Sequence, residues 1–239
     1  MLSDFARGLR DLIFPNLCAR CESLLDDFGI DFCPACTHSI THEPNRTCPR
    51  CAGTVAEFAD VAAGCSRCRD DHFHFDGVSR LGPYDGLLRD CILSMKHRAG
   101  ETLAECVGLL WARHQEGRFR EIGVDVVIPV PLHWWRRLCR GYNQSECLSS
   151  AISVQLKIPH MPCALRRIRP TKSQVILTAA GRRTNMKRAF RVMRGTNLSG
   201  RKVLLIDDVL TTGSTASDAA RAMKEAGAAA VYVSVLAHR

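Results

Sequence analysis

The run VLLIDDVLTTGST, at residues 203–215, holds the densest group of chemically active side chains in this sequence. Two adjacent carboxylates follow an apolar run, and a glycine-containing series of hydroxyl residues comes directly after them. A glycine lets the backbone approach an anion closely, while hydroxyls and the amides of a helix start donate hydrogen bonds to it. We therefore predict a monophosphate cradle formed by Thr211, Thr212, Gly213, Ser214 and Thr215.

The two carboxylates must face another part of the ligand, because they would repel a phosphate. Carboxylates accept hydrogen bonds from hydroxyls, directly or through a bound Mg²⁺. Asp207 and Asp208 therefore indicate a ribose 5-phosphate whose 2′ and 3′ hydroxyls they contact. Other nucleotide motifs fit less well: no GxGxxG follows a strand, and Arg201 stands at the lysine position of the nearest P-loop-like run. An ordinary capped turn needs one hydroxyl, whereas this loop supplies four.

Cysteine is the second chemically informative residue type. Two thiolates separated by two residues can turn onto one metal ion, and two such pairs complete a tetrahedron. The pattern favours two structural zinc sites over redox-active dithiols or an iron–sulfur cluster. Eight of the 13 cysteines form four CxxC pairs, Cys18 and Cys21, Cys33 and Cys36, Cys48 and Cys51, and Cys65 and Cys68.

The pairing of these four CxxC motifs is open at the level of sequence. The gaps between successive pairs hold 11, 11 and 13 residues, so spacing does not decide whether neighbouring or alternating pairs share a metal. We prefer neighbours, because each site then closes locally. A segment of this kind has little apolar core, so we expect it to need zinc in order to fold.

Charge is divided unequally along the 239 residues. Residues 1–75 hold 7 basic and 11 acidic residues, whereas residues 76–239 hold 26 and 13. Residues 133–202 contain sixteen Lys or Arg and one acid, Glu146. A segment this basic indicates a polyanionic partner, either a phosphorylated metabolite or nucleic acid, and charge alone does not choose between them.

The elements that position these groups suggest two domains, 1–75 and 76–239. Apolar runs at 125–131, 203–207 and 231–236 are typical of buried parallel strands. Residues 214–226 predict a helix capped by Ser214 and Thr215 and ended by Gly227. Strand, loop, helix and strand form a βαβ unit, so the expected fold class is α/β.

The N-terminal residues predict an amphipathic helix rather than a secretion signal, since Leu2, Phe5, Leu9 and Leu12 recur among charged residues. No apolar run approaches the roughly 20 residues of a membrane-spanning helix. We therefore expect a cytoplasmic protein whose cysteines stay reduced.

The run VLLIDDVLTTGST resembles the phosphoribosyl pyrophosphate motif of type I phosphoribosyltransferases, and the whole chain resembles the ComF family (ComFC and GntX type). Members of this family fuse a double zinc ribbon to a phosphoribosyltransferase domain. The other matching segments are the cysteine pairs, LLRDCILSMKHRAGETLA, VPLHWWRRLCRGYNQS and TKSQVILTAAGRRTNMKRAF, in the family's order. The resemblance implies a type I phosphoribosyltransferase fold, a parallel sheet flanked by helices, preceded by a small double zinc ribbon.

The resemblance also implies roles for basic residues. The segment VPLHWWRRLCRGYNQS is similar to the pyrophosphate loop, with a diphosphate clamped by Arg136, Arg137 and Arg140. The segment TKSQVILTAAGRRTNM resembles a mobile loop that closes over the ligand, with anion contacts from Lys172, Arg182 and Arg183.

Two further expectations concern residues without a predicted contact to the ligand. Trp134 and Trp135 are expected to pack in the core or against a hood over the ligand. Arg166, Arg167 and Arg169 lie outside the family-like segments and are expected to take no part in ligand binding.

Two functions remain compatible with the sequence. The first is a phosphoribosyltransferase that uses phosphoribosyl pyrophosphate and Mg²⁺, with Asp207 and Asp208 as its catalytic carboxylates and with an unidentified acceptor. The second is a non-catalytic single-stranded-DNA-binding factor that retains the fold and works with a DNA-uptake machinery, as the family's association with DNA uptake implies.

Overall fold

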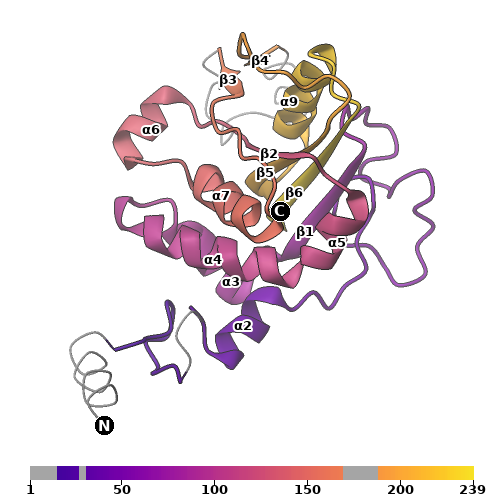
Figure 1. Ribbon diagram of the computed structural model, residues 1–239. Helices are drawn as coiled ribbons and strands as arrows, with labels where there is room; N and C mark the ends of the chain where they lie inside the picture. Colours follow the sequence, from indigo (N-terminus) through magenta and orange to yellow (C-terminus); the bar gives the residue numbers. More distant parts are fainter. Residues whose placement is uncertain (1–14, 27–30, 169–187) are drawn as a thin grey trace.

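The computed structural model describes residues 15–26, 31–168 and 188–239 (Figure 1). The helix expected near the N-terminus and the predicted loop residues Lys172, Arg182 and Arg183 lie outside these ranges. The described elements are, in order, α2 (Pro34–Thr41), β1 (Gly77–Pro83), α3 (Gly86–Ser94), η1 (Arg98–Gly100), α4 (Glu101–His114), α5 (Glu116–Ile122), β2 (Val126–Pro129), α6 (Trp134–Arg140), α7 (Gln144–Leu156), β3 (Leu165–Arg167), β4 (Phe190–Val192), β5 (Lys202–Leu210), α9 (Ser214–Glu225) and β6 (Ala230–His238).

A four-stranded parallel sheet with the order β1-β6-β5-β2 lies at the centre of the part of the structure formed by residues 77–239. The three predicted strands are confirmed as β2, β5 and β6, and β1 completes the sheet. β5 continues beyond its predicted end because Val209 and Leu210 pair with Ala237 and His238. Since all four strands run in the same direction, their carboxyl ends meet at one edge of the sheet, the usual place for a ligand in α/β folds.

Helices cover both faces of the sheet, as Figure 1 shows. Side chains of β5 alternate between the two faces, since neighbouring residues of a strand point in opposite directions. Leu204 and Ile206 belong to a core shared with α3, α4 and α7. Val203 and Leu205 belong to a second core shared with α9 and with the antiparallel pair β3–β4. The predicted α/β class is confirmed, with β5 at the centre of both cores.

Helix α9 begins differently from the prediction. Its N-cap is Gly213, which has a left-handed φ of 71° and makes no side-chain capping hydrogen bond. Ser214 and Thr215 are therefore the first residues of the helix rather than its caps. The first-turn amides of any helix lack an intrahelical acceptor, and no side chain at the N-cap of α9 accepts from them.

Arg80 joins the N-terminal module to the sheet. It lies on β1 with only 2% of its side chain exposed, and its Nε and Nη2 atoms lie 2.5 and 2.9 Å from the two carboxylate oxygens of Glu43. Nη2 also donates to the Thr54 hydroxyl at 2.9 Å. The Arg80 guanidinium therefore binds both cysteine-bearing segments, the one before residue 45 through Glu43 and the one after it through Thr54, to the edge strand β1.

None of the described helices has the length and apolar character needed to cross a membrane.

We expect Glu43→Ala to lower the free energy of unfolding by about 2–3 kcal/mol, because it leaves a buried guanidinium without its carboxylate. Urea denaturation measures this change. The control is Glu57→Ala, since Glu57 is exposed and only its backbone carbonyl is used, as an acceptor for Arg46. An equal loss of stability in both variants would contradict the role given to the Arg80–Glu43 pair.

Candidate phosphate-binding site and cysteine clusters

The carboxyl ends of β2 and β5 open into a pocket of about 920 Å³. The pocket is lined by the end of β5 with its two acids, by the loop that leads into α9, and by the first residues of α6 and α7. Segments that are distant in the sequence thus meet at the sheet edge where the parallel topology predicts a ligand.

Most of the predicted hydroxyl loop faces this pocket. Thr211, Gly213, Ser214 and Thr215 are among its lining residues, whereas Thr212 is not. The hydroxyl of Thr212 instead lies 2.9 Å from the hydroxyl of Ser214. Thr212 therefore acts on the pocket through Ser214, and the left-handed turn at Gly213 directs the loop into α9.

Gly213 is held in place by an aromatic residue of the N-terminal module. A Cβ atom at this position would lie 2.8 Å from Cε1 of Phe73, closer than packed atoms approach. Phe73 stacks on Phe75 with ring centroids 4.7 Å apart, and it also packs against the second cysteine cluster. The neighbouring His74 amide donates to the Ser217 hydroxyl of α9 at 3.1 Å. The module after residue 45 is thus built into the support of the hydroxyl loop.

The two predicted carboxylates have different surroundings. Asp207 accepts from the Ser145 hydroxyl at 3.1 Å, whereas Asp208 accepts from the Gln144 side-chain amide at 3.0 Å and lies 3.4 Å from Nζ of Lys96. Burial and the neighbouring Asp208 charge raise the pKa of Asp207 to about 8. A cation bound between the carboxylates would offset this repulsion, so their oxygens suit a hard divalent ion.

Lys96 is a pocket residue that sequence reasoning missed. It belongs to the segment LLRDCILSMKHRAGETLA, to which we assigned no chemical role. The Tyr142 hydroxyl donates to the carbonyl of the preceding Met95, and Arg98 Nε donates to the Cys139 carbonyl at 3.2 Å. These bonds tie the loop after α3 to the last turn of α6 and to the residues that follow it, which brings Lys96 to Asp208.

The structure places two of the three arginines of the predicted diphosphate clamp at the pocket. Arg136 and Arg140 line the pocket, and Arg140 donates to the Oε1 atom of Gln144. Gln144 therefore bridges Arg140 and Asp208, which fixes one cation beside one carboxylate. Arg137 is not among the lining residues, since it lies 3.3 Å from Glu146.

Arg167 belongs to the three arginines that we expected to take no part in ligand binding, and the structure places it at the pocket. Arg167 on β3 lines the pocket, as does Arg239, whereas Arg166 is exposed elsewhere and Arg169 lies outside the described residues. Burial and the nearby charge of Arg136 lower the pKa of Arg167. The cations on this side of the pocket repel one another, and a bound anion would relieve that repulsion.

We expected Trp134 and Trp135 to pack in the core or against a hood over the ligand, and the structure excludes the core. Trp134 is 67% exposed and Trp135 is 56% exposed, and both line the pocket. Helix α6 buries none of its residues, so it offers these side chains no core in which to pack.

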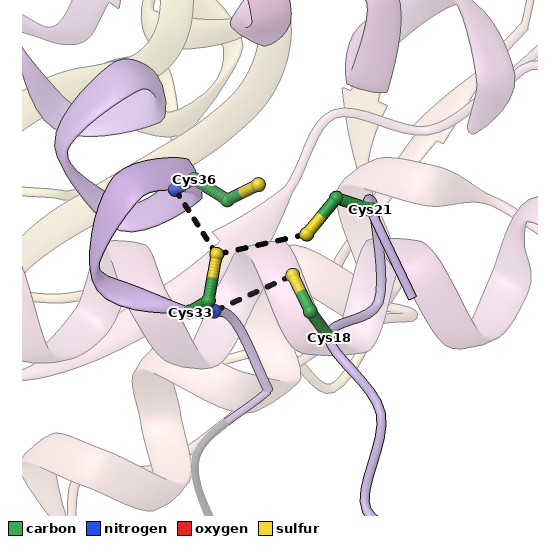
Figure 2. Close-up of side chains that lie close together, drawn as sticks. All are labelled: Cys18, Cys21, Cys33 and Cys36. Atoms are coloured by element: carbon green, nitrogen blue, oxygen red, sulfur yellow. Dashed lines mark hydrogen bonds between the residues drawn. The ribbon is translucent and has the colours of Figure 1, made fainter. Parts of the chain in front are cut away.

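The eight paired cysteines form two clusters of four, and neighbouring pairs share a cluster as we predicted. Figure 2 shows the first cluster, with Cys18 and Cys21 facing Cys33 and Cys36 at the start of α2. This cluster is partly exposed, since Cys21 is exposed and Cys33 is half-buried, whereas the second cluster is buried throughout. In Figure 1 the two cysteine-bearing segments lie on separate sides of α2 rather than against each other.

The sulfur distances test whether zinc fits. Four sulfurs at 2.3 Å from a tetrahedral zinc ion lie about 3.8 Å apart. Sγ of Cys21 lies 3.7 Å from Sγ of Cys33, and Sγ of Cys51 lies 3.6 Å from Sγ of Cys65. Backbone amides also donate to the sulfurs, for example Cys33 N to Cys18 Sγ at 3.4 Å. Both clusters fit a tetrahedral thiolate site of the kind found in a double zinc ribbon.

We expect Asp207→Asn to raise the melting temperature at pH 8 by about 2–4 °C and to have a smaller effect at pH 5. The folded protein keeps the Asp207 proton up to about pH 8, whereas the unfolded chain loses it near the ordinary aspartate pKa of 3.8, so parental stability falls as pH rises between these values. An asparagine does not titrate. Thermal unfolding at several pH values measures the difference, with exposed Glu121→Gln as control. A gain that did not grow with pH would contradict this account.

Comparison with known proteins agrees with the fold and the clusters. Residues 151–239 match the phosphoribosyl transferase domain family. Competence protein F of Haemophilus influenzae is 30% identical over 222 residues, which cover 90% of this chain and 94% of that protein. DNA utilization protein YhgH of Escherichia coli K12 is 31% identical over 93% of this chain and 96% of its own, and competence protein ComFC of Bacillus subtilis is 23% identical over 83% and 80%. With these relatives, the parallel sheet and the two four-cysteine clusters, the chain belongs to the ComF family, in which a double zinc ribbon precedes a type I phosphoribosyltransferase domain.

Proposed function

We propose that this protein is a phosphoribosyltransferase that binds phosphoribosyl pyrophosphate together with Mg²⁺. The observation that carries the proposal is the composition of the pocket of about 920 Å³, in which a hydroxyl and glycine loop, two adjacent carboxylates and a group of cations meet. Each part suits a different part of one ligand: a monophosphate, two ribose hydroxyls and a diphosphate. No smaller anion would use all three.

The hydroxyl loop would bind the 5-phosphate. Thr211, Ser214 and Thr215 offer hydroxyls beside the first turn of α9, where amide groups and the helix dipole favour an anion. Gly213, with a left-handed φ of 71°, turns the loop into α9 so that these hydroxyls face the pocket. The ligand's 5-phosphate would therefore lie directly above Phe73 and the second cysteine cluster.

The carboxylates and cations would act on the ribose and on the leaving group. Asp207 and Asp208 would accept hydrogen bonds from the ribose hydroxyls or would hold Mg²⁺ through their oxygens. When bound, Mg²⁺ supplies positive charge that stabilises the departing diphosphate. Arg136, Arg140 and Lys96 lie on the same pocket and would add charge-assisted hydrogen bonds to that diphosphate. The bond between ribose carbon 1 and the diphosphate breaks as the acceptor attacks, so stabilising the leaving group favours transfer.

Zinc in the two cysteine clusters would be structural. All four ligand positions of each site are filled by thiolates, which leaves no open position for a substrate. Thiolate sites of this kind persist where cysteines remain reduced, which supports a cytoplasmic location.

Binding of single-stranded DNA is the second candidate function. It is favoured by the excess of basic residues between 133 and 202 and by the exposed tryptophans beside the cations. The names of the relatives, competence protein and DNA utilization protein, support a role in handling DNA. Single-stranded DNA and phosphoribosyl pyrophosphate can bind at the same pocket. Variants that affect the two ligands differently are therefore needed to distinguish the two functions.

Paired arginine variants test the proposed function. We expect Arg136→Ala with Arg140→Ala to weaken binding of phosphoribosyl pyrophosphate and Mg²⁺ by about 100-fold, since two charge-assisted hydrogen bonds are lost. Isothermal titration calorimetry measures the affinity. The matched control is Arg166→Ala with Arg191→Ala, two exposed arginines paired on β3 and β4 and absent from the pocket lining. Equal affinity in both double variants would overturn the assignment of the pocket.

The same variants address the DNA function. Strand binding spreads over many cations, so either pair of substitutions should weaken it only in part. The log–log salt dependence should become shallower by roughly 0.7 for each lost phosphate contact. The outcome against DNA binding by this surface has two parts. Neither double variant changes the affinity for single-stranded DNA, and only Arg136→Ala with Arg140→Ala loses affinity for phosphoribosyl pyrophosphate.

Zinc content and ligand affinity together test whether the two cysteine clusters have different roles. We expect about two zinc ions per chain by elemental analysis. Cys48→Ser with Cys51→Ser should remove one ion and weaken ligand binding, because Phe73 packs on that cluster and on Gly213. Cys18→Ser with Cys21→Ser should remove the other ion and leave ligand affinity within about twofold. Folded protein without zinc would contradict the metal assignment, and equal effects on the ligand would contradict the coupling through Phe73.

A further inference from the structure

Helix α6 carries two large aromatic side chains that the fold does not use. Trp134 and Trp135 are 67% and 56% exposed, and Leu138 on the same helix is 65% exposed. The third tryptophan of the chain, Trp111, is fully buried and packs against Phe119. Figure 1 shows α6 standing away from the body of the molecule. Exposed aromatic side chains on a helix that buries nothing do not stabilise the fold, and large exposed apolar surface generally marks a contact with another molecule.

The two indoles differ from Leu138 in their position. Both line the pocket, together with Arg136 from the next position of the helix and Arg140 from its end, whereas Leu138 does not. The indole planes are almost perpendicular, at 82°, with centroids 5.7 Å apart, and the His133 ring lies 5.6 Å from that of Trp134. Flat aromatic faces therefore stand directly beside the cations of the pocket.

This combination selects one class of ligand. Aromatic faces stack on flat heteroaromatic rings, and arginines beside them bind phosphate groups. A purely apolar partner would leave the neighbouring guanidinium groups without counter-charge, and a simple phosphate would leave the indoles unused. A ligand that joins a nucleobase to a phosphate satisfies both.

We propose that Trp134 and Trp135 form a stacking platform for the nucleobase of a phosphorylated ligand held in the pocket. The inference rests on the proposed function, since it takes the pocket to bind phosphorylated ribose, and it adds the chemical class of the group beyond the ribose. The same chemistry occurs in a free nucleotide and in a single DNA strand. The experiment therefore compares ligands with and without a base in both forms.

The first arm uses the intact protein with ribose 5-phosphate and with adenosine 5′-monophosphate, which differ by the base. We expect the nucleotide to bind about tenfold more tightly and to quench tryptophan emission, because only Trp134 and Trp135 are accessible to a stacking ring. In Trp134→Ala with Trp135→Ala the tenfold advantage should disappear, while the affinity for ribose 5-phosphate stays unchanged. Leu138→Ala, an equally exposed change on the same helix, should behave as the parent protein does.

The second arm compares a thymidine oligonucleotide of about 12 nucleotides with an abasic strand of the same length and charge. If the double tryptophan variant loses the preference for the strand with bases, the platform serves single-stranded DNA as well. If it keeps that preference and loses only the mononucleotide advantage, the platform serves a small acceptor or product.

The outcomes distinguish this inference from the proposed function. Equal affinity for ribose 5-phosphate and the nucleotide, without quenching, and no loss of strand affinity in the double variant would overturn the stacking platform and leave phosphoribosyl binding intact. Failure of both ribose 5-phosphate and phosphoribosyl pyrophosphate to bind would overturn the proposed function, and the strand arm would then decide the platform alone. Thermal unfolding checks that the exposed substitutions leave the fold unchanged.

Discussion

The contact between Gly213 and Phe73 is the constraint on which the site depends. The loop after β5 can turn into α9 with a left-handed residue only because no Cβ stands between its backbone and the aromatic ring. The same ring packs on the buried cysteine cluster, so the geometry of the hydroxyl loop is linked to the folding of the N-terminal module. Two segments separated by about 140 residues, His74 and Ser217, are hydrogen-bonded at this point. The cysteine module therefore supports the binding site, although none of the described residues that line the pocket belongs to it.

Groups of like charge lie close together in the pocket and repel one another. Two carboxylates adjoin along β5, and several cations face them from other elements, so each group has a neighbour of the same sign. Gln144 lies between Asp208 and Arg140, since it donates to Asp208 and accepts from Arg140, whereas Lys96 contacts Asp208 directly at 3.4 Å. A pocket built in this way is less stable empty than filled, because a ligand with hydroxyls on one side and phosphate oxygens on the other supplies the missing partners. Burial first, and the neighbouring Asp208 charge second, raise the pKa of Asp207.

The local parts of this site were predictable from the sequence, and the long-range parts were not. The unit from β5 through Gly213 to α9 and β6 is encoded by contiguous residues, so its apolar runs and hydroxyl loop were sufficient. Arg167 reaches the pocket because β3 pairs with β4 across a long connection, and Lys96 does so because Tyr142 anchors the carbonyl of Met95. Neither pairing leaves a periodic pattern. The tryptophans were misjudged for a related reason, since composition favours burial of a Trp–Trp pair unless the helix that carries it is known to pack on nothing.

The distribution of cations gives the two modules different tasks. Arg46, Arg50 and Arg67 of the N-terminal module donate to backbone carbonyls of their own cysteine-bearing segment, at 2.9, 2.6 and 3.1 Å respectively. Guanidinium groups used in this way hold irregular loops that lack a sheet or a large core. The guanidinium groups of Arg46, Arg50 and Arg67 therefore help to keep rigid the segment that carries Phe73. Their hydrogen bonds are made within that segment. The cations that line the pocket all follow residue 95 in the sequence, and their neighbouring charges raise the free energy of the empty site. Anion recognition therefore belongs to the sheet edge, and the cysteine module controls it through shape rather than through charge.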